Sequence, residues 1–338
     1  MPSSSVALRI AANRIDAPKK TTSVQSTVSR FTAARYPGLV SSAVTDRPVL
    51  AGVLGAFVIA FSAILVRLAE VSPSTAAFFR CAYALPALAA LAWLEDRRYG
   101  RRPLRERVPL WVAGLMFAAD LTFWHHSIEA VGAGLATVLG NIQVVFVALL
   151  AWVALGERPD NRALASIPVV FAGVVLISGV VGAGAYGDDP LMGVIFGLLT
   201  AITYALFILI LRQGNVDVRR PAGPLFDATL SGAVFSALGG IIVGDIEWAP
   251  GLESQAWLVL LALSSQVLGW LLISVSLPRL PAVLTSIVLM LQPVSTVFLG
   301  ALLLSEAPSG VQLVGVAIVI AGVAVATVKP REREPAPV

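Results

Sequence analysis

The sequence predicts an all-α membrane protein in which ten transmembrane helices form a five-plus-five inverted repeat. Its composition, an internal repeat and the distribution of its basic residues support this fold class. Hydrophobic residues make up 57% of the 338 residues and charged residues only 13%, with a mean hydropathy of +0.84. A soluble domain carries about 25% charged residues. Because this composition cannot cover a water-facing surface, we expect a lipid bilayer to surround the protein.

One stretch of 47 residues occurs twice. Residues 131–177 align without gaps with residues 280–326, and 13 of the 47 aligned positions are identical. Each copy has a hydrophobic helix, a Glu-x-Pro turn at Glu157 or Glu306, and a second hydrophobic helix that contains Ala-Gly-Val. Internal repeats in membrane proteins are typical of transporters.

Ten segments are long and apolar enough to be membrane spans. The hydrocarbon core of a bilayer is about 30 Å thick and needs roughly 20 apolar residues per helix. The segments between them contain proline, glycine or charged residues, which favour turns. The predicted spans are 48–69, 75–94, 108–129, 132–154, 162–182, 190–212, 224–243, 255–277, 282–304 and 311–328.

The basic residues predict the orientation of the chain. With the N-terminus inside, 22 of the 24 Lys and Arg residues fall on the cytoplasmic side, and the other two, Arg67 and Arg80, lie within spans. Cytoplasmic loops of membrane proteins are enriched in Lys and Arg. We therefore expect a multi-pass protein of the cytoplasmic (inner) membrane with both termini in the cytoplasm. The spread of basic residues over one membrane face also argues against a nucleic-acid partner.

The domain organisation follows from the repeat. Five predicted spans separate its two copies, and this odd number gives the copies opposite orientations. Such inverted repeats can exchange conformations around a site near the bilayer midplane. A transit peptide is the alternative for the N-terminal segment, which is rich in Arg and Ser. We predict a disordered cytoplasmic tail (1–47), a first five-helix repeat (48–182), a second (190–328) and a cytoplasmic C-terminal tail (329–338).

Paired motifs in the two copies carry a family resemblance. They are LGERP at 155–159 with FAG at 171–173, and LSEAP at 304–308 with IAG at 320–322. With Arg67 and the Phe-Phe-Arg ending at Arg80, the chain resembles the EamA-type ten-helix transporters of the drug/metabolite transporter superfamily over residues 48–328. The resemblance implies transport of small metabolites, which range in this superfamily from amino acids to amines and drugs.

The sequence departs from the family pattern in one place. The resemblance implies a proline in the middle of both the fourth and the ninth span. Pro293 is present in the ninth span, but the equivalent position of the fourth is Val144. A kink in the fourth span must therefore have another origin, such as Gly140.

Ionisable and amide side chains within the spans are the candidate site residues, because polar groups in a membrane are costly and usually functional. Asp120 is in mid-span, one helical turn from Trp124, and an acid beside an aromatic ring suits a cation or a proton. The expected substrate-binding residues are Asp120, Trp124, Asn141, Tyr204, Gln266, Trp270 and Gln292. For the amides, the alternative is that they hold helices together.

Asp120 and His125 are also the candidates for proton coupling, since burial favours the uncharged form of a carboxyl group. The alternatives are a structural pair between Asp120 and an arginine, and a hydrogen-bonded histidine at a helix end. Four further residues are expected to have structural roles: Arg80, Glu157, Glu306 and Pro293. We expect the two glutamates to cap or orient the repeat hairpins.

The sequence contains no phosphate-binding loop, no nucleophile with its base and no cluster of metal ligands; its one cysteine is Cys81. We therefore expect no enzyme activity, cofactor or metal. The predicted function is secondary active transport, in the export direction, of a small metabolite such as an amino acid, amine or drug-like compound. The alternatives are a nucleotide-sugar or sugar-phosphate antiporter of the same superfamily and a non-transporting membrane enzyme or receptor. The expected partners are a small-molecule substrate and lipid, and a homodimer is left open.

Overall fold

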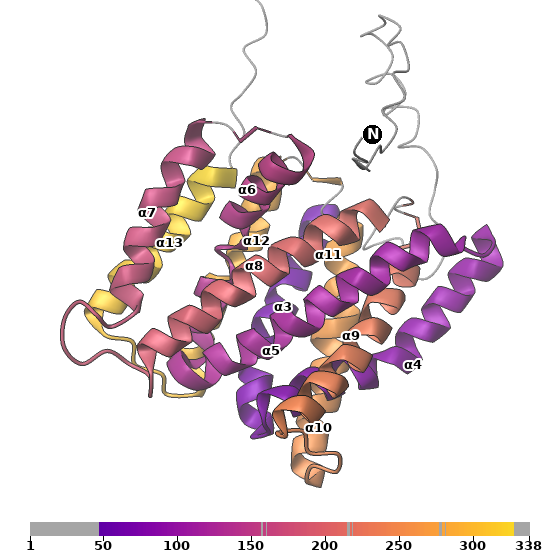
Figure 1. The fold of residues 1–338 in the computed structure, drawn as a ribbon, viewed down its shortest axis with the longest axis horizontal. Coiled ribbons are helices and arrows are strands. Elements are labelled where there is room, and N and C mark those ends of the chain that lie inside the picture. Colours follow the sequence, from indigo (N-terminus) through magenta and orange to yellow (C-terminus); the bar gives the residue numbers. More distant parts are fainter. Residues whose placement is uncertain are drawn as a thin grey trace, which may run out of the picture. The chain divides into compact units, whose positions relative to one another are not determined.

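The computed structural model describes residues 47–156, 158–159, 161–214, 217, 219–276, 279–280 and 282–327. Within these residues all regular secondary structure is helical (Figure 1). The two predicted terminal tails lie outside the described residues, apart from Arg47. The elements are α3 (Pro48–Ala69), α4 (Pro73–Tyr99), α5 (Leu104–Gly140), α6 (Gln143–Leu155), α7 (Asn161–Ile177), α8 (Pro190–Gly214), α9 (Ala222–Val243), α10 (Leu252–Leu261), the π-helix η1 (Ala262–Gly269), α11 (Trp270–Ser276), α12 (Ala282–Leu303) and α13 (Gly310–Thr327).

Several helices differ from the predicted spans at their ends, as α4 does by ending at Tyr99, and the backbone explains the differences in the fifth and eighth spans. The fifth span was predicted to reach residue 182, but α7 ends at Ile177, and Gly179 and Gly182 have positive φ angles of 73° and 91°. Such backbone suits glycine and stops a right-handed helix. The eighth span changes from α-helix to π-helix over η1 and back again. Short π segments change which side chains share a face, and they are frequent at functional sites.

The third and fourth predicted spans meet in α5. Gly132 interrupts this element with a non-helical backbone at φ 84° and ψ 168°, at the position where the sequence predicts a boundary. The fourth span is then broken a second time between α5 and α6, where the axis bends by 45°. The sequence names Gly140 as a possible origin of a kink in this span, and Gly140 is the last residue of α5 before the break.

Helices at equivalent positions of the two repeats pack against each other. α4 pairs with α9 and α7 pairs with α13 (Figure 1). At the α7–α13 crossing, a Cβ atom on Gly315 would lie only 2.7 Å from the carbonyl oxygen of Gly173, so neither position has room for a side chain. Two copies related by a two-fold axis are expected to pair in this manner.

Acidic side chains join the two repeats at the helix ends. Glu95, near the end of α4, accepts hydrogen bonds from the amides of Ala222 (2.9 Å) and Gly223 (2.8 Å) at the start of α9. Asp245, after α9, accepts one from the amide of Ser74 (3.4 Å) at the start of α4. The first amides of a helix have no intrahelical acceptor, and a carboxylate satisfies them favourably. The α4–α9 pair is therefore held at both ends by reciprocal caps.

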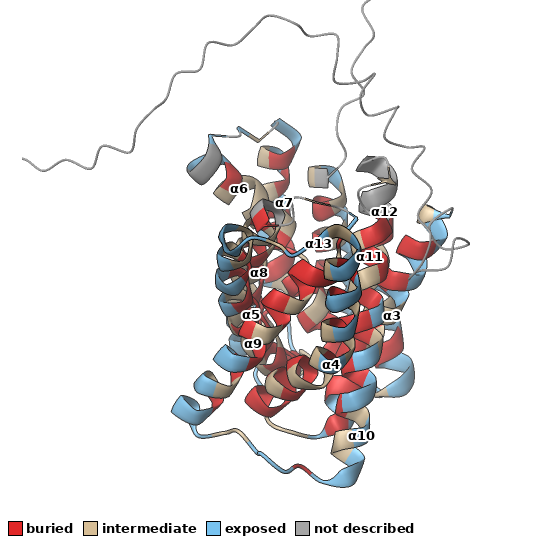
Figure 2. Ribbon diagram, turned by 90° about the vertical axis from the view of Figure 1, so that its right-hand side faces the viewer, coloured by how far each residue is buried: buried red, intermediate tan, exposed pale blue. Residues whose placement is uncertain are grey.

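The outward faces of the helices carry large apolar side chains. Ile242 and Val153 are each 84% exposed and Phe298 is 65% exposed. Figure 2 shows this distribution, with buried residues on the inward faces and exposed residues around the outside. An apolar surface of this extent is typical of a protein surrounded by lipid. In the described part of the chain, five helices are long and apolar enough to cross a membrane, or six when α5 and α6 count as one bent span.

Candidate functional site

A central cavity of about 80 Å³ lies where helices of both repeats meet. Four of its helices, α3, α4, α5 and α8, approach it with small or polar side chains as well as aromatic ones. The break after α5 borders it, and so does Trp270, the first residue of α11 directly after the π-helix η1. The lining residues are Ile59, Ser62, Arg80, Phe117, Asp120, Leu121, Trp124, Thr137, Gly140, Asn141, Thr200, Tyr204, Trp270 and Gln292.

The cavity brings together six of the seven residues predicted to bind substrate. They come from four separate segments of the sequence, which the fold places around one space. The six are Asp120, Trp124, Asn141, Tyr204, Trp270 and Gln292. The seventh, Gln266, is fully buried and is not among the lining residues.

Gln266 instead accepts a hydrogen bond from Arg80, which does line the cavity. The Nε of Arg80 donates to Gln266 Oε1 (3.1 Å), and its Nη1 donates to Ser62 Oγ (2.9 Å). The Gln266 amide nitrogen in turn donates to Thr229 Oγ1 (3.1 Å). Arg80 is only 4% exposed, so these bonds satisfy part of a buried charge and connect α3, α4, η1 and α9.

Asp120 is the acidic group of the cavity. Its side chain is 6% exposed, and no side chain or amide in the described residues donates a hydrogen bond to its carboxylate. It lines the same cavity as Arg80 without forming an ion pair with it in the described part of the chain. The Thr200 hydroxyl, also on the cavity wall, is buried and has no partner among the described residues. These groups are available to a polar ligand.

Aromatic rings form much of the remaining wall. The guanidinium carbon of Arg80 lies 5.7 Å from the Trp124 ring centroid. Tyr204 and Trp270 meet edge to face at 6.3 Å, and Phe117 lies 6.3 Å from Trp270 in the same geometry. Faces of aromatic rings attract cations, and their apolar area favours an amphipathic ligand.

The structure separates His125 from this cavity. The His125 ring is 2% exposed, and its Nδ1 lies 3.1 Å from the carbonyl oxygen of Pro73. Its other surroundings belong to a second cavity of about 400 Å³, which is also lined by Arg67, Glu70 and Glu129. The two predicted proton-coupling residues therefore border different cavities.

Besides Arg80, two of the predicted structural residues lie within the described part of the chain. Glu306 is 5% exposed, and its two carboxylate oxygens accept hydrogen bonds from the amides of Ala133 (2.5 Å) and Gly134 (3.0 Å), directly after the break at Gly132. Pro293 lies within α12, next to Gln292. Glu157, the repeat counterpart of Glu306, lies outside the described residues.

Sequence reasoning missed several lining residues. Ser62 is the only hydroxyl residue of α3, and this isolation in an apolar helix is a signal that could have identified it. Phe117 precedes Asp120 by three residues and so shares its face. Phe123, three residues after Asp120, does not line the cavity and stacks on Phe196 with ring centroids 6.3 Å apart.

Two related helical halves around a small cavity lined by polar and aromatic side chains are an arrangement that occurs in transporters built from repeats. The chain belongs to the EamA-like transporter family, whose model matches residues 47–179 and 191–328. This match confirms the resemblance found in the sequence. A comparison with curated proteins found no match. One solved crystal structure is similar over 83% of this chain and 96% of its own, with a TM-score of 0.55 and 19% identity, and it shows a shared fold alone.

Proposed function

We propose that this protein is a secondary active transporter that exports a small metabolite with a cationic group, such as an amino acid, an amine or a drug-like amine, by alternating access. The observation that carries the proposal is the cavity, where a buried carboxylate without a hydrogen-bond donor faces a space bordered by aromatic rings. Burying an unpaired charge is costly, and a cationic ligand or a proton relieves that cost.

Each polar group of the cavity has a role in this proposal. Asp120 binds the cationic group of the substrate or, between substrates, a proton. Trp124, Tyr204 and Trp270 enclose the ligand and contribute cation–π attraction. Asn141 and Gln292 supply neutral hydrogen bonds. Arg80 is a positioning residue: its bonds to Ser62 and Gln266 hold the cavity wall, and its charge favours a ligand that also carries an anionic end.

The membrane arrangement in the proposal is ten spans with both termini in the cytoplasm of the cell. The reciprocal caps of Glu95 and Asp245, and the pairing of α4 with α9, support an inverted relation between the repeats. The partition of the basic residues supports the orientation in the cytoplasmic membrane. α7 and α13, with 17 and 18 residues, cross the membrane as a close pair in this arrangement.

The cavity is less suited to a nucleotide sugar or a sugar phosphate. Recognition of phosphate groups calls for arginine or lysine donors. Arg80 is the single basic side chain that lines the cavity in the described residues, and Asp120 opposes it with a negative charge. A small amine or zwitterion matches this charge balance better.

The test starts with metabolites that accumulate in cells lacking the protein, followed by flux of the best candidate in proteoliposomes. Flux should rise with an imposed pH gradient. Asp120→Asn keeps the size of the side chain but removes its charge. We expect transport to fall by at least about tenfold, since a hydrogen-bonded charged contact is worth roughly 1.5–3 kcal/mol, and the response to the pH gradient to disappear.

Asp188→Asn is the matched control, because this acid is exposed in the segment between α7 and α8 and does not line the cavity. It should transport like the wild-type protein. Equal flux and equal gradient dependence in wild type and in a folded Asp120→Asn protein would remove Asp120 from both binding and coupling.

A further inference from the structure

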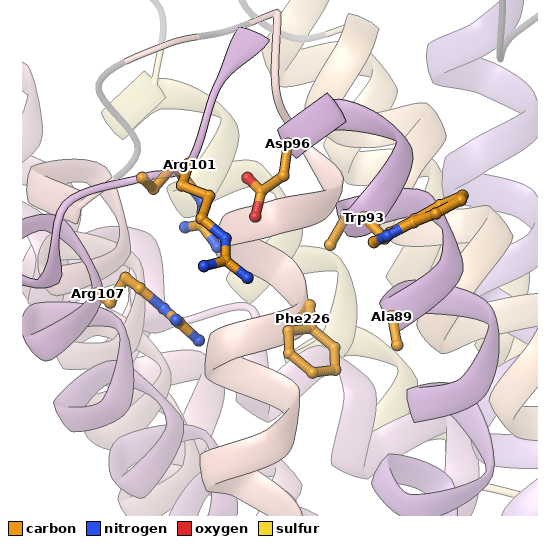
Figure 3. Close-up of a pocket in the computed structure, with 8 residues that line it drawn as sticks. Ala89, Trp93, Asp96, Arg101, Arg107 and Phe226 are labelled. Carbon is orange, nitrogen blue, oxygen red and sulfur yellow. The ribbon is translucent and has the colours of Figure 1, made fainter. Parts of the chain in front are cut away.

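A third cavity, of about 390 Å³, lies at the end of the molecule where the α4–α5 loop meets the start of α9. It shares no lining residue with the central cavity. Figure 3 shows Arg101 and Arg107 entering from one side, Trp93 on the opposite side and Phe226 below. Its wall therefore combines basic and aromatic side chains, and none of them has a role in the transport proposal.

The basic side chains of this cavity exceed the acids that neutralise them. Arg102 (2.7 Å) and Arg107 (2.8 Å) share one fully buried carboxylate, that of Asp227. Asp96, which also lines the cavity, is already ion-paired with Arg220. Arg101 adds a further positive charge at an exposed position. The cavity wall thus carries net positive charge.

Arg102 carries the strongest indication of a ligand. Its side chain is only 9% exposed, yet its Nε and Nη1 atoms are buried and have no hydrogen-bond partner in the described residues. A buried donor without an acceptor costs roughly 1–3 kcal/mol, more when it is charged. A ligand with several acceptor oxygens removes that cost. The planar guanidinium group suits phosphate, because it can donate two parallel bonds.

The surroundings place this cavity at a membrane interface. Trp93 is 52% exposed and Trp111 is 40% exposed. The Arg97 guanidinium lies 3.8 Å from the Trp93 ring centroid, and that of Arg107 lies 6.0 Å from the Trp111 centroid. Tryptophan gathers at the headgroup level of bilayers, and basic pockets between helices bind anionic headgroups there.

We propose that this cavity binds a phosphate group through Arg101, Arg102 and Arg107, and that an anionic phospholipid supplies it, with its glycerol and upper acyl region against Trp93 and Phe226. A soluble phosphate would share the same chemistry with the arginines but would leave the aromatic side of the cavity uncovered. The two sources can be separated by experiment.

The experiment measures binding of dioctanoyl-phosphatidylglycerol, dioctanoyl-phosphatidylcholine and inorganic phosphate to the purified full-length protein in neutral detergent, by native mass spectrometry. Two variants address the site. Arg101→Gln removes an exposed charge, and Arg102→Lys keeps a charge for Asp227 while removing the unpartnered nitrogens. Arg105→Gln is the control, since this exposed arginine at the start of α5 does not line the cavity.

We expect saturable binding of the phosphatidylglycerol, weaker binding of the phosphatidylcholine, and a loss of roughly tenfold in affinity in both site variants but not in the control. Inorganic phosphate bound with the same dependence on the variants, in place of the phosphatidylglycerol, would assign the site to a soluble phosphate. Equal phosphatidylglycerol binding by the wild-type protein and all three variants would overturn the proposal. So would a wild-type protein that binds neither phosphatidylglycerol nor inorganic phosphate.

Discussion

The fourth predicted span and the ninth are two copies of one repeated sequence, yet the copy without a proline is the one that breaks. The fourth span consists of the end of α5 and of α6, with a 45° bend between them. Its counterpart α12 contains Pro293 and continues as one helix from Ala282 to Leu303. A proline is therefore neither necessary nor sufficient for a break at this position of the repeat.

Local hydrogen bonding explains the break. The Asn141 side chain donates to the carbonyl oxygen of Thr137 (2.9 Å), which also accepts from the Asn141 amide (3.2 Å). The next amide, that of Ile142, bonds to Leu139 (3.1 Å), three residues back instead of four. Asparagine side chains compete with the backbone in this way, and a turn with three-residue spacing often marks a bend.

The break changes which Asn or Gln side chain lines the cavity. Gln143 and Gln292 are equivalent in the repeat, but only Gln292 lines the cavity. Gln143 is 7% exposed, and its Oε1 has no hydrogen-bond partner among the described residues. Asn141, two residues earlier, lines the cavity from the broken copy, where α12 has Met290. Identity between repeats thus does not give equivalence around the cavity.

The largest effect expected from this comparison is a loss of transport when these amide side chains are replaced. Asn141→Leu and Gln292→Leu should each lower transport by roughly tenfold or more, because each removes a hydrogen bond worth about 1–2 kcal/mol to the ligand. Gln143→Leu should leave transport nearly unchanged, since it replaces a buried amide whose oxygen is unsatisfied. Flux in proteoliposomes, normalised to the amount of folded protein, measures all three. A loss of transport in Gln143→Leu as large as in Gln292→Leu would contradict the conclusion that Asn141, and not Gln143, lines the cavity from the first repeat copy.

A smaller effect is expected at the start of the broken copy. Glu306→Gln keeps one acceptor oxygen for Ala133 and Gly134 but removes the charge, so stability should fall by about 1 kcal/mol. The exposed acid Glu253 gives the control, Glu253→Gln. Thermal unfolding in detergent measures stability, and relative rates for several substrates show whether preference changes. A changed substrate preference with unchanged stability would place Glu306 in recognition instead of capping.

The smallest effect is expected from a proline added to the broken copy. The Val144 amide makes only a long bond of 3.4 Å, to Asn141, so Val144→Pro should cost well below the ~3 kcal/mol of a proline inside an intact helix. Val138→Pro, in the unbroken part of α5, is the reference variant, because there the proline should cost the full ~3 kcal/mol of stability. The stability of both variants is measured by thermal unfolding in detergent. Equal destabilisation of the two variants would show that the helix is not open at residue 144.

Hydropathy and turn residues were sufficient to predict the helical class, the positions of most helices and the boundary at Gly132. These features depend on local composition, which a sequence shows directly. The sequence indicated Gly140 as a possible origin of a kink, and the break begins there. The role of Asn141 in the break and the π-helix η1 were not predicted, because both depend on competition between alternative hydrogen bonds in the folded protein. Gln266 was expected to bind substrate but does not line the cavity. It lies four residues before Trp270 and would share its face on a regular α-helix, but the π-helix η1 changes that spacing.

The residues of the candidate site were predictable where an ionisable or amide side chain lies within a mostly apolar span, as Asp120 and Gln292 do. It was not predictable where long-range partners decide the direction of a side chain. Arg80 contacts Ser62 and Gln266, 18 and 186 residues away, and no local pattern indicates those bonds.

The central claim is that the cavity opens to each side of the membrane in turn. Thr200→Cys in a Cys81→Ser protein places one small thiol on the cavity wall, where the Thr200 hydroxyl has no partner in the described residues. Reference cysteines at Asp188 and Arg105 mark the outer and cytoplasmic faces. A membrane-impermeant maleimide should label residue 200 in vesicles of either orientation, with transported substrate slowing the reaction from both sides. Labelling of residue 200 from one face alone, with each reference cysteine labelled as expected, would contradict alternating access.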